Sequence, residues 1–245
     1  MEQVSIRTGD GECRSYVFTP DGTGSWPAVI LYMDGLAIRP ALMAMADRMA
    51  KEGGYVVLLP DLYYRVGPYE PFDPKEVFGG GDVMAAIGKY FTSTDNGKAA
   101  TDTCQYLDYL STRKDVSGDK VGTTGYCMGG AMSMTAQATY PGRIVASASF
   151  HGGNLAGDDP LSPHLLADKM KGRIYVAAAV DDPFYPVEMH EKLERTLTEA
   201  KVDYKAEFYE GALHGWTMTD FPIYNENQAE HHWRELFGLF KSKLS

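Results

Sequence analysis

The chain has 245 residues, with 23 Lys and Arg against 33 Asp and Glu, and a formal net charge of −10. This length suits one large core, and we predict that residues 1–245 form a single domain. The acidic balance argues against nucleic acid or an anionic membrane as a partner. The N-terminus has no apolar run of signal-peptide length, no later stretch approaches a membrane span, and the three cysteines form no disulfide or zinc pattern. We therefore expect a cytoplasmic protein without a metal or other cofactor.

Apolar runs alternate with helical patterns along the chain, which predicts a mostly parallel sheet with helices on both faces. An antiparallel hairpin of Val4 to Ile6 and Tyr16 to Phe18 opens the fold. The buried strands expected after it are Ala28 to Met33, Tyr55 to Leu59, Val121 to Thr124, Ile144 to Phe150, Ile174 to Val180 and Tyr204 to Tyr209. The expected helices are Pro40 to Ala50, Thr101 to Leu110, Ala131 to Thr139, Val187 to Ala200 and Ala229 to Leu239. The aromatic loop Asp61 to Pro74 and the glycines 79–81 after it are expected to carry substrate-facing variation.

Residues 125–130 read Gly-Tyr-Cys-Met-Gly-Gly between a predicted strand and a predicted helix. This spacing is typical of a nucleophile elbow of the G-x-S-x-G kind, with cysteine in the serine position. The glycines two residues before and two after Cys127 remove side chains that would collide across the turn. The turn also places the thiol at a helix N-terminus, where the helix dipole favours a thiolate. Cys127 is therefore the predicted nucleophile, and a small buried hydrophobic residue is the alternative.

Two polar side chains follow later strands of the predicted sheet. Asp182 follows the strand that ends at Val180, and His214 follows the strand that ends at Tyr209. Ligands bind outside the carboxyl ends of parallel strands, so both side chains are expected beside Cys127. The order nucleophile, acid, histidine is the order of α/β-hydrolases. The alternatives are a helix cap for Asp182 and a solvent-exposed loop position for His214.

These motifs together resemble the dienelactone hydrolase family over nearly the whole chain. Residues 125–130 are similar to the family's G-Y-C-x-G-G, and residues 60–63 to its P-D-L-Y. The resemblance implies an α/β-hydrolase fold and a catalytic triad, here Cys127, Asp182 and His214. It favours Asp182 over the adjacent Asp181 as the acidic member. It also implies that Asp34 replaces an acid, usually Glu, that contacts the resting thiol.

The chain departs from the family where the substrate carboxylate is bound. Family members that cleave dienelactone hold this group with arginines, one of them four residues beyond the catalytic histidine. That position is Met218 here, and no arginine lies between Arg65 and Arg113, the region that supplies the other. A buried carboxylate without a cationic partner is costly, so we expect the anion-binding role to be lost. Arg39 and Arg65 remain as candidates to bind a substrate carboxylate in place of the missing arginines.

We predict a cysteine-dependent hydrolase of small esters or lactones that works through a thioester acyl-enzyme. The oxyanion is expected between the backbone N–H of Met128 and that of Gly35 or Leu36. His214 is expected to protonate the leaving alkoxide, and Asp182 to hold its tautomer. The predicted pocket residues, each with ordinary packing as the alternative, are Tyr63, Tyr64, Phe72, His151, Trp216 and Met218.

Two other functions share parts of this pattern. A glutamine amidotransferase-type enzyme also places a G-x-C-x-G elbow after a strand. That class pairs its cysteine with His-x-Glu, and no histidine here has Glu two residues on. A non-catalytic ligand receptor on the hydrolase fold is the alternative from another class, because a receptor can retain a triad.

Overall fold

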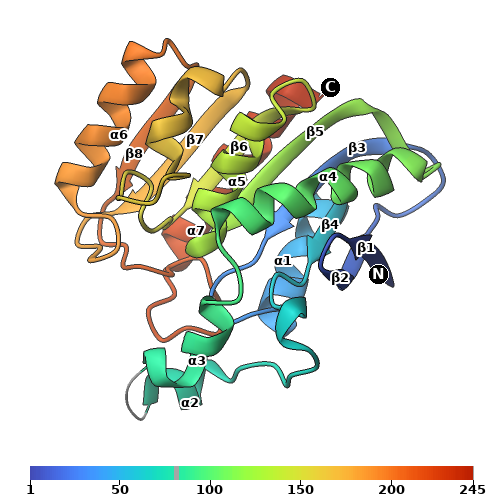
Figure 1. Cartoon of the computed structure of the whole chain (residues 1–245), viewed down its shortest axis with the longest axis horizontal. Coiled ribbons are helices and arrows are strands. Elements are labelled where there is room, and N and C mark those ends of the chain that lie inside the picture. Colours follow the sequence, from blue (N-terminus) through green and yellow to red (C-terminus); the bar gives the residue numbers. More distant parts are fainter. Residues whose placement is uncertain (80–82, 245) are drawn as a thin grey trace.

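The structure is a computed structural model that describes residues 1–79 and 83–244. Within that part of the chain, eight strands form one sheet in the order β1-β2-β4-β3-β5-β6-β7-β8 (Figure 1). The strands are β1 (Glu2–Thr8), β2 (Gly11–Phe18), β3 (Trp26–Tyr32), β4 (Val56–Pro60), β5 (Val116–Tyr126), β6 (Ile144–Phe150), β7 (Arg173–Ala179) and β8 (Tyr204–Tyr209). Strand β2 pairs antiparallel with β1 and with β4, and the other neighbouring strands pair in parallel.

Helices cover both faces of this sheet. The α-helices are α1 (Pro40–Lys51), α2 (Pro74–Gly79), α3 (Val83–Phe91), α4 (Asn96–Thr112), α5 (Met128–Thr139), α6 (Val187–Glu199) and α7 (Glu226–Leu244), and the short 3-10 helices are η1 (Tyr64–Val66) and η2 (Pro163–Lys169). Helices α1 and α7 pack on one face, and α4, α5 and α6 on the other (Figure 1). The mostly parallel sheet with helices on both faces that the sequence predicts is therefore confirmed.

The central strands are apolar along their whole length because both of their faces are covered. Residues 28–32 of β3 and all five residues of β4 are buried. Continuous apolar runs of this kind are typical of parallel strands between two helical layers. Their apolar runs made these strands predictable from the sequence. The hairpin predicted at the chain start is present as β1 and β2, at one edge of the sheet.

Helices α2 and α3 were not predicted. The loop Asp61 to Pro74 contains only η1, and two helices follow it, beyond the end of the sheet where α5 begins (Figure 1). Gly80 and Gly81 of the predicted glycine turn lie outside the described residues. Across residues 1–79 and 83–244, no helix has both the length and the apolar character that a membrane span requires.

Candidate active site

Cys127 makes the turn between β5 and α5. Its backbone has φ 55° and ψ −121°, which side-chain-bearing residues rarely adopt. A Cβ atom on Gly125 would lie 1.8 Å from the Gly129 carbonyl oxygen, and one on Gly129 would lie 2.4 Å from the Tyr32 carbonyl oxygen. Both positions must therefore be glycine for the turn to form, which explains the glycine spacing of the motif.

The backbone of Cys127 is held from strand β6. Its N–H donates to the Phe150 carbonyl oxygen and to Nδ1 of His151, each at 3.2 Å. Nε2 of His151 lies 2.8 Å from Oγ1 of Thr217, so this ring joins the elbow to the loop that carries His214. Burial, with the charge on His214, lowers the pKa of His151 well below its ordinary value. The ring is therefore neutral, with Nε2–H as donor and Nδ1 as acceptor.

Asp182 and His214 form a buried pair at the ends of β7 and β8. Nδ1–H of His214 donates to Oδ2 of Asp182 at 2.6 Å, and the Asp182 side chain is 0% exposed. Oδ1 of Asp182 accepts the N–H of Phe184 at 2.9 Å, so both carboxylate oxygens are fixed. Asp181 is exposed. The structure thus places Asp182, and not Asp181, against the histidine.

The other nitrogen of His214 faces the thiol. Nε2 is buried, and among the described residues it has no partner other than the Cys127 side chain, which interacts with the His214 ring. Burial alone acts to lower the pKa of His214, but the negative charge of Cys127 and the hydrogen bond to Asp182 outweigh it and raise the pKa to about 10. Beside a Cys127 thiolate, His214 is therefore an imidazolium at neutral pH.

The loop after β3 borders the other side of the thiol. Asp34 is 2% exposed and binds Arg39 through both carboxylate oxygens, at 2.7 and 3.0 Å. Its Oδ1 also accepts the Leu36 N–H at 2.9 Å, so that donor is in use. The Gly35 N–H makes no hydrogen bond to the described residues. Met128 is the first residue of α5, so its N–H has no partner within the helix.

Arg39 clamps this loop to the histidine loop. Its Nε and Nη2 donate to Asp220 at 2.7 and 3.2 Å, and Nη1 donates to the Ala37 carbonyl oxygen at 3.2 Å. With the two bonds to Asp34, all five N–H donors of the guanidinium are in use. The side chain is 2% exposed, and its guanidinium carbon lies 5.0 Å from the Phe221 ring centre. Arg39 therefore has no donor left for a substrate anion.

A cavity of about 700 Å³ opens at Cys127 and His214. Apolar side chains of α2 and α3, among them Phe78, Ile87 and Phe91, also line it. Across the described residues, no Lys or Arg lines this cavity. Pockets of this size accommodate whole small molecules, so the cavity is the natural substrate site.

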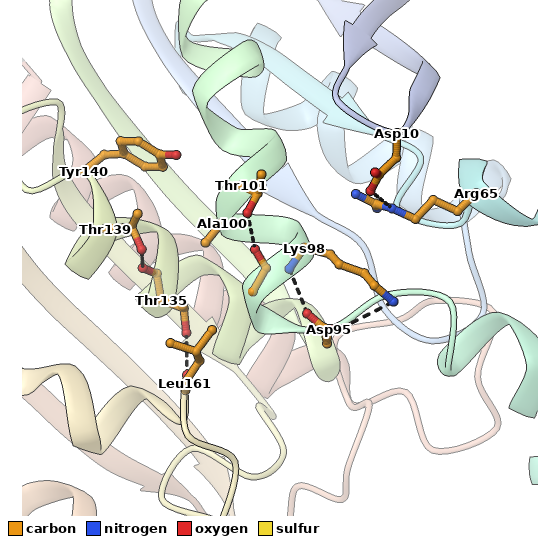
Figure 2. A pocket seen from close by; sticks show the side chains of 11 residues that line it. Asp10, Arg65, Asp95, Lys98, Ala100, Thr101, Thr135, Thr139, Tyr140 and Leu161 are labelled. Carbon is orange, nitrogen blue, oxygen red and sulfur yellow. Dashed lines mark hydrogen bonds and ion pairs between the residues drawn. The ribbon is translucent and has the colours of Figure 1, made fainter.

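A second hollow of about 510 Å³ lies over α4 and α5 (Figure 2). Arg65 lines it and is bound to Asp10 at 2.7 Å and to Asp102 at 2.9 Å. Lys98 lines it as well and pairs with Asp95, which borders both hollows. No member of the Cys–His–Asp set reaches this hollow, so Arg65 is not placed to bind a substrate of Cys127.

One group of side chains has the composition of a metal site. Ligand atoms of Glu207, His231 and Glu235 lie within 4.8 Å of one another. Nζ of Lys205 lies 2.9 Å from a carboxylate oxygen of each glutamate. The ammonium group already pairs with both carboxylates, and the three residues lie on β8 and α7 and do not line the cavity.

Residues 13–244 match the profile of the dienelactone hydrolase family. The chain belongs to the dienelactone hydrolase family. It is a carboxylic ester hydrolase, as the motifs predicted. A Synechocystis sp. protein provisionally named carboxymethylenebutenolidase is 27% identical, over 98% of this chain and 96% of its own length.

Two solved structures show the same fold at lower identity. A Klebsiella pneumoniae protein, provisionally described as a dienelactone hydrolase, superposes with a TM-score of 0.85 at 20% identity, covering 98% of this chain and 97% of its own. A dienelactone hydrolase-like promiscuous phosphotriesterase from metagenomic libraries gives a TM-score of 0.80 at 21% identity, covering 100% and 98%.

In this dienelactone hydrolase family member, the predicted cavity residues divide into two groups. Of the six predicted pocket residues, only His151 is among those that line the cavity, where Gly35, Leu36 and Met128, predicted as oxyanion donors, also lie. The prediction is wrong for the five others, which do not line it: Tyr63, Tyr64, Phe72, Trp216 and Met218. The sequence marks aromatic residues near the site but does not indicate toward which side of the backbone each one points.

These five side chains support the site from outside the cavity. Trp216 and Met218 are fully buried in the core beneath the histidine loop. Tyr63 is also fully buried, and its hydroxyl donates to the Gly35 carbonyl oxygen at 3.0 Å, which steadies the loop after β3. Tyr64 and Phe72 are partly buried and pack against the edge of the core.

The predicted contact between Asp34 and the resting thiol is not observed. Asp34 lines the cavity, yet no hydrogen bond joins it to Cys127 in the described part of the chain. Arg39, five residues later, turns back and takes both of its oxygens. The clamp to Asp220 and the wall of α2 and α3 were not predicted, although the apolar spacing in residues 83–91 is a helical signal.

Proposed function

We propose that this hydrolase cleaves small esters or lactones through a thioester on Cys127. The observation that supports it most directly is the pairing at the elbow. Cys127 lies on a strained turn, and the neighbouring His214 is hydrogen-bonded at 2.6 Å to the fully buried Asp182. A nucleophile, a base and a group that orients the base are the three parts that nucleophilic catalysis needs.

In the proposed reaction, the Cys127 thiolate attacks the carbonyl carbon of the substrate. The tetrahedral oxyanion accepts hydrogen bonds from the N–H groups of Gly35 and Met128. His214 protonates the departing alkoxide, and the thioester forms. His214 then takes a proton from water, which attacks the thioester and releases the acid, while Asp182 steadies the imidazolium.

The leaving groups favour esters and lactones over amides. A thiolate leaves a tetrahedral adduct more readily than an amine nitrogen does, so an amide adduct reverts to substrate. A glutamine amidotransferase-type activity is disfavoured on another ground, because His214 is followed by Gly215 and Trp216 and not by the His-x-Glu pattern of that class. The acidic charge and the absence of a disulfide pattern support a small-molecule substrate and a cytoplasmic location, with no nucleic-acid or membrane partner.

Pre-steady-state kinetics with an activated ester test this proposal. Mixing the protein with p-nitrophenyl acetate is expected to release one equivalent of p-nitrophenol per site in a burst, before slower turnover. Cys127→Ala is expected to abolish both phases. Cys104 has comparable intermediate exposure, so Cys104→Ala is the matched control and is expected to retain both. Ligand binding without any release of p-nitrophenol would instead identify a receptor.

A further inference from the structure

An apolar wall lies directly against the oxyanion loop. Ile87 and Phe91 of α3, with Leu36, line the cavity beside Gly35. A Cβ atom on Gly35 would lie 3.3 Å from the Phe91 ring and 3.6 Å from Ile87, so the wall touches this residue. Phe78 of α2 continues the wall toward solvent and is 45% exposed. These four side chains (Leu36, Phe78, Ile87 and Phe91) are called the α2–α3 wall below.

The charges around the cavity are unfavourable to an anion. Among the described residues, the carboxylates that line it are Asp34, Asp95, Asp158 and Asp159, of which Asp34 is paired with Arg39 and Asp95 with Lys98. Every donor of Arg39 is in use, and Arg65 lies in the other hollow. The only cation in the described lining is the His214 imidazolium, which is already paired with Asp182 and Cys127. A carboxylate that entered would lose its hydration without gaining an unpaired cationic partner, which costs several kcal/mol in typical cases.

The proposed mechanism orients the substrate between these features. The leaving oxygen must face His214, because that residue protonates it. The oxyanion faces the N–H groups of Gly35 and Met128, so the acyl group takes the remaining direction, into the cavity. The apolar side chains of that cavity that lie against the oxyanion loop are those of the α2–α3 wall. An acetyl group would leave most of the 700 Å³ unfilled.

We infer that the α2–α3 wall is an acyl-chain subsite, and that the substrates are uncharged esters whose acyl group is an apolar chain of several carbons. This inference rests on the proposed thioester mechanism, because the mechanism sets which end of the ester faces the wall. Each methylene that leaves water for an apolar surface gains about 0.8 kcal/mol, or roughly fourfold in affinity or rate.

Three p-nitrophenyl esters test the subsite in the intact protein. The acetate and hexanoate differ by four methylenes, and the adipate monoester carries a carboxylate in place of the terminal methyl of the hexanoate. We expect kcat/KM for the hexanoate to exceed that for the acetate by at least tenfold and that for the adipate by at least tenfold. Equal rates for acetate and hexanoate, or a faster adipate, would overturn the subsite.

Paired variants test whether the preference for the hexanoate depends on the α2–α3 wall. Phe78→Ala is expected to reduce the hexanoate-to-acetate ratio threefold or more, and Phe78→Arg to raise the adipate-to-hexanoate ratio about tenfold. Phe208 is 37% exposed and lies outside the cavity, so Phe208→Ala and Phe208→Arg are matched controls that should leave the ratios unchanged. Ratios that move equally in both pairs would contradict a local role for Phe78.

The burst separates the inference from the function on which it rests. A full burst with all three esters and no preference among them overturns the acyl-chain subsite and leaves the thioester mechanism in place. No burst with any ester overturns both. A burst with the predicted preference supports both.

Discussion

Replacing Arg39 by Met is expected to be among the most destabilising changes in this fold. Arg39 and Asp34 are 2% and 3% exposed, and the substitution removes both of their hydrogen bonds and leaves the carboxylate buried without a cation. Breaking one side of a buried pair costs about 3–5 kcal/mol. Asp220 is 28% exposed, so losing its contact adds at most about 1 kcal/mol. Together these losses predict a decrease of about 4 kcal/mol in the free energy of unfolding.

A double-mutant cycle measured by urea unfolding isolates the pair. Asp34→Asn alone is expected to cost less than Arg39→Met, because Arg39 keeps Asp220. The double variant is expected to be more stable than the sum of the single changes by about 2 kcal/mol, since no buried carboxylate remains uncompensated. A loss below 1 kcal/mol for Arg39→Met, or strict additivity in the cycle, would refute the clamp as a source of stability.

Three further changes test the site. The pKa of His214 is raised to about 10, so kcat/KM should fall only above about pH 10, where the imidazolium loses its proton. Asp182→Asn should lower the pH at which kcat/KM falls. An unchanged pH profile would contradict the effect of Asp182 on the pKa of His214. Burial lowers the pKa of His232 from its ordinary 6.5 to about 3. The free energy of unfolding should therefore decrease as the pH falls from 6.5 to about 3, by up to about 1.4 kcal/mol per pH unit. In His232→Gln the urea midpoint should depend less on pH over this range. His151→Ala should lower kcat roughly tenfold with little change in KM, because the Cys127 N–H loses one acceptor. His151→Asn should restore part of that rate, since its amide oxygen can replace Nδ1 and Asn tolerates φ 39°; a larger effect on KM than on kcat would argue against a role at the elbow.

The parts of the site that the sequence predicted are those set by short segments. The elbow at Cys127 depends on two glycines within two residues of it, and Asp182 and His214 each follow directly from a strand. Parallel strands bring their carboxyl ends to one edge, so local position along the chain becomes proximity in space. That rule is enough to assemble the three side chains.

The parts that were missed depend on contacts between distant segments. Asp34 and Asp220 are brought to Arg39 by the packing of two loops, and nothing in the local sequence indicates that Arg39 binds both oxygens of Asp34. Trp216 and Met218 follow His214 closely, yet the turn buries both in the core. Side-chain direction in irregular loops has no periodicity from which it can be predicted.

Peptide mass analysis of the acid-quenched reaction tests the central claim most directly. After brief mixing with p-nitrophenyl hexanoate, the peptide that contains Cys127 should carry one hexanoyl group, which neutral hydroxylamine removes as it does other thioesters. The His214→Ala variant should form this adduct far more slowly. An acyl group on any other residue, or undiminished hydrolysis by Cys127→Ala, would contradict a thioester mechanism at this elbow.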